Sequence, residues 1–179
     1  MKLSKIIRLS SNTNLYSISP FSLGSFVTST FGTFDNNTPV QIVNGNGNNT
    51  FFPDLIFPKN QYERGKCQCT FIASHGILAL TDYDESSVCL YNTQTGHTVK
   101  VTDSQIEKPR GVCKGPNGSI LVACVSSIVQ LTIHGEVLTS VDVGMHDLQA
   151  INISRDWTQL VVSCIATGNC QLRLFEILK

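Results

Sequence analysis

The sequence predicts an all-β fold, a β-propeller built of about four four-stranded antiparallel blades. Two observations lead to this prediction. Short runs rich in Val, Ile, Thr and Leu alternate with polar residues along the chain, bounded by Gly, Asn, Asp and Ser. Strongly apolar strands also return at a nearly constant spacing. No helical stripe of useful length interrupts them.

The spacing of the apolar strands indicates the repeat. These strands begin at residues 26, 77, 120 and 160, so consecutive starts are 51, 43 and 40 residues apart. All-β repeats of this length are typical of propeller blades. The first interval is longer because residues 58–68 have the composition of an inserted loop. The four strands are Phe26–Thr30, Ile77–Thr81, Ile120–Val125 and Leu160–Ile165.

Each repeat continues in the same order after its apolar strand. An alternating strand follows, then a glycine turn, then a fourth strand. The glycine turns are Asn44-Gly45, Thr95-Gly96 and His134-Gly135. We therefore expect one domain over residues 1–179, with blades at 14–52, 69–103, 109–143 and 148–177.

The two ends of the chain suggest how the ring is completed. The last repeat stops after three strands, while one extra strand, Leu3–Leu9, precedes the first repeat. Pairing the two would close a four-bladed ring and cover an exposed strand edge. The alternative is a fragment of a six-bladed propeller that stays open or dimerises.

The balance of charge and the hydropathy of the chain argue against two classes of binding partner, nucleic acids and membranes. Thirteen basic residues balance thirteen acidic ones, which disfavours nucleic-acid and membrane binding. The longest apolar run, Ile120–Val125, is too short to cross a bilayer.

The N-terminus has no secretory pattern, so we expect the mature protein to begin there and to be cytoplasmic, with reduced thiols. Cys89, Cys113, Cys124 and Cys164 are expected to be buried as small apolar residues.

Two stretches resemble the NHL repeat. Residues 108–123 (Lys-Pro-Arg-Gly-Val-Cys-Lys-Gly-Pro-Asn-Gly-Ser-Ile-Leu-Val-Ala) follow its pattern Pro-x-Gly-Val and then Gly-x-Leu-x-Val. Residues 75–82, 88–91 and 95–96 resemble its second half, including an aspartate after the buried strand. The chain is similar to the C-terminal propellers of tripartite-motif (TRIM) ubiquitin-protein ligases. That resemblance implies substrate or RNA recognition, with the ligase chemistry elsewhere.

No catalytic or cofactor motif is present, so the sequence predicts a binding domain that is not an enzyme and holds no cofactor. Cys67 and Cys69 have no second pair to complete a zinc site, and the four histidines stand apart in the sequence. Asp82, Asp84 and Glu85 form the one acidic cluster. A solvated turn is the simpler interpretation, and calcium is the alternative. No metal is expected.

A small basic group offers a further alternative. Lys108, Arg110 and Lys114, with Tyr91 or Phe57 nearby, suggest RNA binding by charge and stacking. The principal expectation is recognition of a protein partner by blade-end loops, in a ubiquitin-ligase context by resemblance. A metal-dependent propeller hydrolase is the alternative from another class. The expected contact residues are Asp82, Asp84, Glu85, Lys108, Arg110, Ser126, Thr167 and Asn169.

Overall fold

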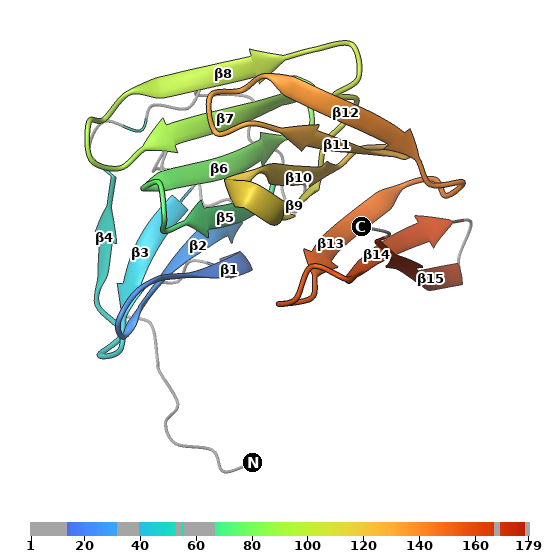
Figure 1. Cartoon of the computed structure of the whole chain (residues 1–179). Helices are drawn as coiled ribbons and strands as arrows, with labels where there is room; N and C mark the ends of the chain where they lie inside the picture. Colours follow the sequence, from blue (N-terminus) through green and yellow to red (C-terminus); the bar gives the residue numbers. More distant parts are fainter. Residues whose placement is uncertain (1–13, 32–39, 53–54, 56–66, 167–168, 178–179) are drawn as a thin grey trace.

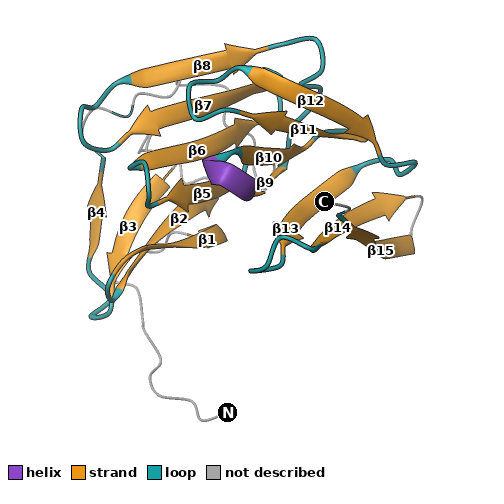
Figure 2. Cartoon of the chain, in the orientation of Figure 1, coloured by secondary structure: helices purple, strands orange, loops and turns teal. Residues whose placement is uncertain are grey.

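The computed structural model describes residues 14–31, 40–52, 55, 67–166 and 169–177. They form four antiparallel sheets arranged around a common axis, a four-bladed β-propeller (Figure 1). The predicted fold class is therefore confirmed. Apart from one 3-10 turn, Pro116–Gly118, the regular structure of the described residues is β (Figure 2).

Each blade is a meander in which consecutive strands pair. Blades 1, 2 and 3 have four strands each, and blade 4 has three in the part that the structure describes. Residues 3–9, expected to complete blade 4, lie outside the described residues. The strands are β1 (Asn14–Ser22), β2 (Ser25–Phe31), β3 (Val40–Asn44), β4 (Asn49–Phe51), β5 (Cys69–Ile72), β6 (Ile77–Asp82), β7 (Ser87–Asn92), β8 (Thr98–Thr102), β9 (Gly111–Lys114), β10 (Ile120–Ala123), β11 (Ser127–Leu131), β12 (Val137–Asp142), β13 (Leu148–Ile153), β14 (Gln159–Ala166) and β15 (Asn169–Glu176).

The four apolar strands of the sequence are the second strands of the four blades, β2, β6, β10 and β14. Strand β6 is buried along its whole length because blades pack on both of its faces. Leu78 and Leu80 contribute to the core shared by blades 1 and 2, whereas Ala79 faces the core shared by blades 2 and 3. Burial on both faces explains why β6 and β10, the second strands of the two middle blades, are nearly continuous in apolar residues instead of alternating.

The turns between third and fourth strands repeat the same local chemistry. The Asn92 carboxamide accepts hydrogen bonds from the backbone N–H groups of Gln94 and Thr95, at 2.9 and 3.0 Å. Asn44 plays the same part in blade 1, and the hydroxyl of Thr132 does so in blade 3. The chain then reverses through a glycine with positive φ, such as Gly96. The predicted glycine turns are confirmed at these positions.

Neighbouring blades are joined by apolar cores and by hydrogen bonds between inner strands. Among the described residues, one core lies between each pair of consecutive blades. The Ser17 and Ser19 hydroxyls of β1 accept hydrogen bonds from the backbone N–H groups of Cys69 and Phe71, both at 3.0 Å. The inner strands are thereby held in a fixed arrangement around the propeller axis.

Candidate functional site

Six of the eight expected contact residues gather at one end of the propeller, which we call the loop face. It consists of the β6–β7 turn (83–86), the β8–β9 connection (103–110), the β10–β11 turn (124–126) and the β12–β13 connection (143–147). Strand direction alternates within a blade, so these turns and connections all emerge at the same end. In Figure 1 the arrowheads of β6 and β8 point to this end.

The acidic residues lie in the β6–β7 turn. Asp82 is only 3% exposed, and its carboxylate accepts a hydrogen bond from the backbone N–H of Glu85 at 3.2 Å. Burial raises the pKa of Asp82, partly offset by that hydrogen bond. Glu85 forms an ion pair with Lys100 at 3.3 Å, whereas Asp84 is exposed. The aspartate at the end of the buried strand therefore shapes the turn, and Asp84 and Glu85 lie nearer its surface.

An aromatic residue organises the basic part of the loop face. The Arg110 guanidinium lies over the ring of Tyr83, 4.5 Å from its centroid, and the Lys108 ammonium lies 5.8 Å from the same centroid. Arg110 also donates a hydrogen bond to the side-chain oxygen of Gln149 at 2.8 Å. Because Tyr83 belongs to blade 2, Arg110 to the strand entry of blade 3 and Gln149 to blade 4, one cluster spans three blades.

Backbone hydrogen bonds fix these loops to one another. The Thr81 hydroxyl donates to the Arg110 carbonyl at 2.7 Å, and the Val125 N–H donates to the Glu107 carbonyl at 2.9 Å. The Val143 N–H donates to the Ser126 carbonyl at 3.3 Å, so the Ser126 backbone supports the neighbouring connection. Loops held in this way present their side chains with little conformational freedom left to lose on binding.

The structure separates some residues that the sequence grouped. Strand β9 runs from Gly111 to Lys114, so Arg110 and Lys114 lie at opposite ends of it and do not form one basic patch. Tyr91 is 3% exposed in the core, where it cannot stack on a base. Phe57 and Thr167 lie outside the described residues, and Asn169 begins β15.

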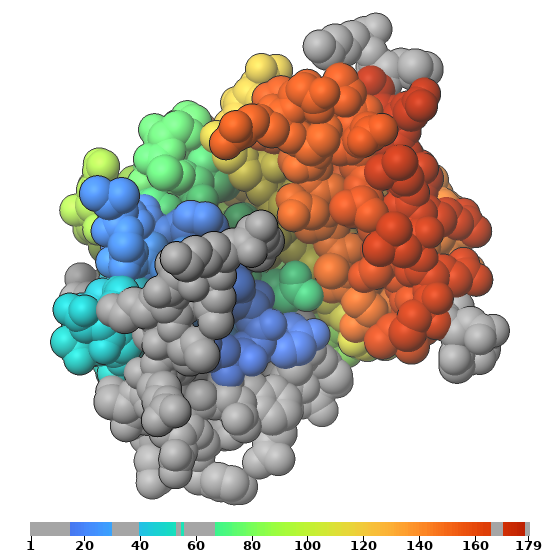
Figure 3. Space-filling model, turned by 90° about the horizontal axis from the view of Figure 1, so that it is seen from below, coloured from blue at the N-terminus to red at the C-terminus, as the bar shows by residue number. Residues whose placement is uncertain are grey.

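A central pocket lies between the inner strands of all four blades. It has a volume of about 450 Å³ and is lined by residues of β1, β5, β9 and β13 and of the turn that follows β13. In Figure 3 the hollow lies between the blue atoms of blade 1 and the orange atoms of blade 4, with green atoms of β5 between them. The loop face is at one end of these strands, and the β13–β14 turn is at the other.

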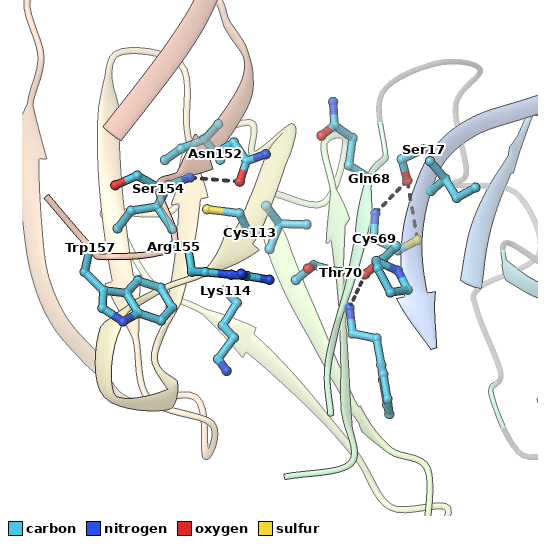
Figure 4. A pocket seen from close by; sticks show the side chains of 17 residues that line it. Ser17, Gln68, Cys69, Thr70, Cys113, Lys114, Asn152, Ser154, Arg155 and Trp157 are labelled. Carbon is cyan, nitrogen blue, oxygen red and sulfur yellow. Dashed lines mark hydrogen bonds between the residues drawn. The ribbon is translucent and has the colours of Figure 1, made fainter. Parts of the chain in front are cut away.

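Lys114, Arg155 and Trp157 line this pocket, and the last two are not among the site residues that the sequence predicts. The Lys114 ammonium is 5.9 Å from the centroid of the Trp157 ring. Figure 4 shows these three side chains on one wall, facing Gln68 and the first two residues of β5, Cys69 and Thr70. One signal was available: Asp156-Trp157-Thr158 occupies a turn where a glycine would be usual, and Trp157 is the one tryptophan of the chain.

The cysteines and histidines show no metal-binding geometry. Among the described residues, no group of three His, Cys, Asp or Glu side chains is placed to hold a metal ion. Cys67 and Cys69 are buried, and burial raises the pKa of Cys69 to about 11. Three of the histidines, far apart in sequence, line a second pocket of about 360 Å³ between blades 2 and 3: His75, His97 and His134.

The part of the chain that the structure describes contains no helix with the length and apolar character needed to span a membrane.

Comparisons with known proteins establish the fold. No protein-family model matches the sequence, and the search of curated proteins found no match. Solved structures do match. A streptogramin B lyase superposes with a TM-score of 0.64 at 16% identity, over 94% of this chain and 57% of that one. A virginiamycin B lyase from Staphylococcus aureus, solved with quinupristin, gives 0.65 at 17%, over 98% and 60%. Kuenenia stuttgartiensis hydrazine synthase gives 0.65 at 16%, over 97% and 49%.

These comparisons correct the expectation that the chain is not an enzyme. Proteins that share its fold include lyases, so neither the propeller nor the lack of a familiar catalytic motif excludes catalysis. At 16–17% identity the similarity shows the fold alone. The chain spans 49–60% of the length of these three proteins. The comparisons confirm a β-propeller, and they do not confirm the NHL or TRIM resemblance.

Proposed function

We propose that this chain is a recognition module and that its loop face binds a protein partner. The observation that carries the proposal is the cluster of Tyr83, Lys108, Arg110 and Gln149, which joins three blades. Tyrosine and arginine are enriched among the residues that dominate binding energy at protein interfaces. Here the arginine is already held by an aromatic face and a hydrogen bond, so binding costs little side-chain entropy.

The residues around this cluster supply the polar rim that such interfaces have. Asp84 and Lys108 are exposed, while Tyr83, Glu85 and Ser126 are partly buried. Both signs of charge are present within neighbouring turns, and the chain carries no net charge. Mixed charge favours a protein surface over a phosphate backbone, which requires an excess of cations.

The NHL-like residues extend the proposal to a more specific context. The loop-face cation Arg110 belongs to the Pro-x-Gly-Val stretch that resembles the TRIM propellers. In that context the partner would be a protein destined for ubiquitination, and this chain would supply recognition while another module supplies the ligase chemistry.

A site-specific crosslinking experiment tests the proposal. A photoreactive amino acid is placed at position 84 on the loop face, and separately at position 134 in a turn at the opposite end. After irradiation in extract of the source cells, mass spectrometry should identify a defined protein from position 84 only. The crosslink should persist in moderate salt and disappear when Arg110→Ala is added to the photoreactive chain.

Two results would overturn the proposal. One is equal capture from both positions, because the interaction would then not be specific to the loop face. The other is recovery of a defined RNA from position 84, with an affinity that falls steeply as salt rises, which would indicate a nucleic-acid partner instead. Appearance of ubiquitin conjugates on the captured protein separates the ligase context from simple binding.

A further inference from the structure

The central pocket has a charge and shape of its own, independent of the loop face. Of its lining residues, all within the described ranges, two are cationic, Lys114 and Arg155, and none is acidic. Its volume of about 450 Å³ is within the range of small-molecule sites in proteins. An anion of modest size would therefore meet favourable charge and adequate space.

The conformation of Trp157 points to a ligand-binding role. Its φ is +61°, a region that bulky residues seldom occupy and that glycine adopts freely. The Asp156 carboxylate accepts hydrogen bonds from the hydroxyls of Ser154 and Thr158, at 2.6 and 2.9 Å. These bonds hold the turn that carries the indole to the pocket. Strained residues supported in this way occur often at binding and catalytic sites.

The opposite wall of the pocket is polar and fixed. Hydroxyls of Ser17 and Ser19 are engaged by backbone N–H groups of β5, so their positions are set. The Gln68 side-chain nitrogen donates to the Gln149 carbonyl of blade 4 at 2.9 Å. Strands from three blades thus maintain the shape of the cavity whether or not it is filled.

We propose that the central pocket binds a small molecule with a planar ring and an anionic group. The ring stacks on the indole of Trp157, while a carboxylate or phosphate pairs with Lys114 and Arg155. Arginine binds such oxyanions through two parallel hydrogen bonds, and lysine contributes a point charge. The inner strands of the four blades line the pocket, and its volume of about 450 Å³ suits a small molecule.

Calorimetric titration of the intact chain with a matched pair of probes tests this proposal. The probes are 4-nitrobenzoate and 4-nitrobenzamide, which share a ring but differ in charge. We expect the carboxylate to bind and the amide to bind at least about tenfold more weakly, as expected for loss of a charge-assisted contact. The substitutions Lys114→Gln and Arg155→Gln should each lower the affinity for 4-nitrobenzoate by about tenfold.

Two further variants separate ligand binding from structure. Trp157→Gly removes the ring where glycine is conformationally favoured, so the protein should stay folded, with an unchanged or raised melting temperature, and lose 4-nitrobenzoate binding. Lys108→Gln, which removes a cation at the loop face, should leave probe affinity unchanged. That control also separates this site from the proposed protein interface, which can fail or succeed independently.

Three results would overturn the proposal: no heat of binding with millimolar 4-nitrobenzoate, equal affinities for the acid and the amide, or full binding by Trp157→Gly. A fall in probe affinity for Lys108→Gln equal to that for Lys114→Gln would likewise overturn the proposal, because probe binding would then depend on the overall charge of the protein and not on the pocket.

Discussion

The guanidinium of Arg110 lies over the ring of Tyr83, with its central carbon 4.5 Å from the ring centroid. This contact joins the turn of blade 2 to the entry of blade 3, and the hydrogen bond from Arg110 to Gln149 extends it to blade 4. The pair therefore links blade packing to the surface that we propose binds a partner.

A double-mutant cycle with Tyr83→Leu and Arg110→Met should reveal this contact as a coupling of about 0.5–1 kcal/mol in urea unfolding. Methionine keeps the length of the side chain while removing its charge, so packing losses largely cancel within the cycle. The exposed ion pair between Glu85 and Lys100 is the matched control, and its coupling should be smaller and should fall as salt is added. A coupling energy of zero between Tyr83 and Arg110 would show that their stacking does not contribute to stability.

Gly111→Ala should destabilise the protein by about 1–3 kcal/mol because it overpacks the junction of blades 3 and 4. A Cβ at this position would lie 2.9 Å from the Cα of Ala150 and 3.0 Å from the Ile151 nitrogen, both backbone atoms that cannot rotate away. Thermal or urea unfolding measures the change. Gly24→Ala is the control for backbone conformation, since Gly24 has φ +74° and open space around it. Gly24→Ala should lower the free energy of unfolding by about 1 kcal/mol, because alanine is disfavoured at a positive φ.

Thiol labelling should distinguish Cys170 from the other cysteines. Cys170 is exposed, whereas the other six are buried. Burial raises the pKa values of Cys89, Cys113 and Cys124 to about 12, so almost no reactive thiolate forms there at pH 8. Iodoacetamide should modify one thiol rapidly in the native protein and the rest only after unfolding. Cys170→Ser should abolish the rapid phase. Fast native labelling of several thiols would contradict the buried assignment.

Asp82→Asn should alter the pH dependence of stability. Burial raises the folded-state pKa of Asp82 above its ordinary value of 3.8, so the folded protein holds this proton more tightly than the unfolded chain does. The stabilising effect of that preference is complete below pH 3.8 and is lost as pH rises through the folded pKa. The unfolding free energy of Asp82→Asn relative to the native chain should therefore increase between pH 3 and neutrality. An unchanged difference over this range would contradict the assigned shift.

The residues that define the blades could be recognised without the structure. The apolar strands begin at residues 26, 77, 120 and 160, and those at 77 and 120 are buried on two faces, which makes them nearly continuous in apolar side chains. The turns at Asn44-Gly45, Thr95-Gly96 and His134-Gly135 carry local signals of their own, a side-chain acceptor and a nearby glycine with positive φ, which is Gly47 in the first turn and Gly96 and Gly135 in the other two. Strand pairing inside a blade is between consecutive segments, so local patterns were sufficient to predict it.

The tertiary structure alone decided which residues meet between blades. Lys108, Arg110 and Lys114 are close in sequence, yet strand β9 carries Lys114 to the opposite end, where it joins Trp157. Arg110 instead meets Tyr83, in a turn 27 positions before it, and Gln149, in a strand 39 positions after it. The sequence by itself determined the repeat and the turns because these depend on neighbouring residues. The central pocket and the loop-face cluster depend on how the sheets pack around the propeller axis. That packing brings together residues far apart in the sequence, and no local or periodic sequence pattern indicates which residues will meet.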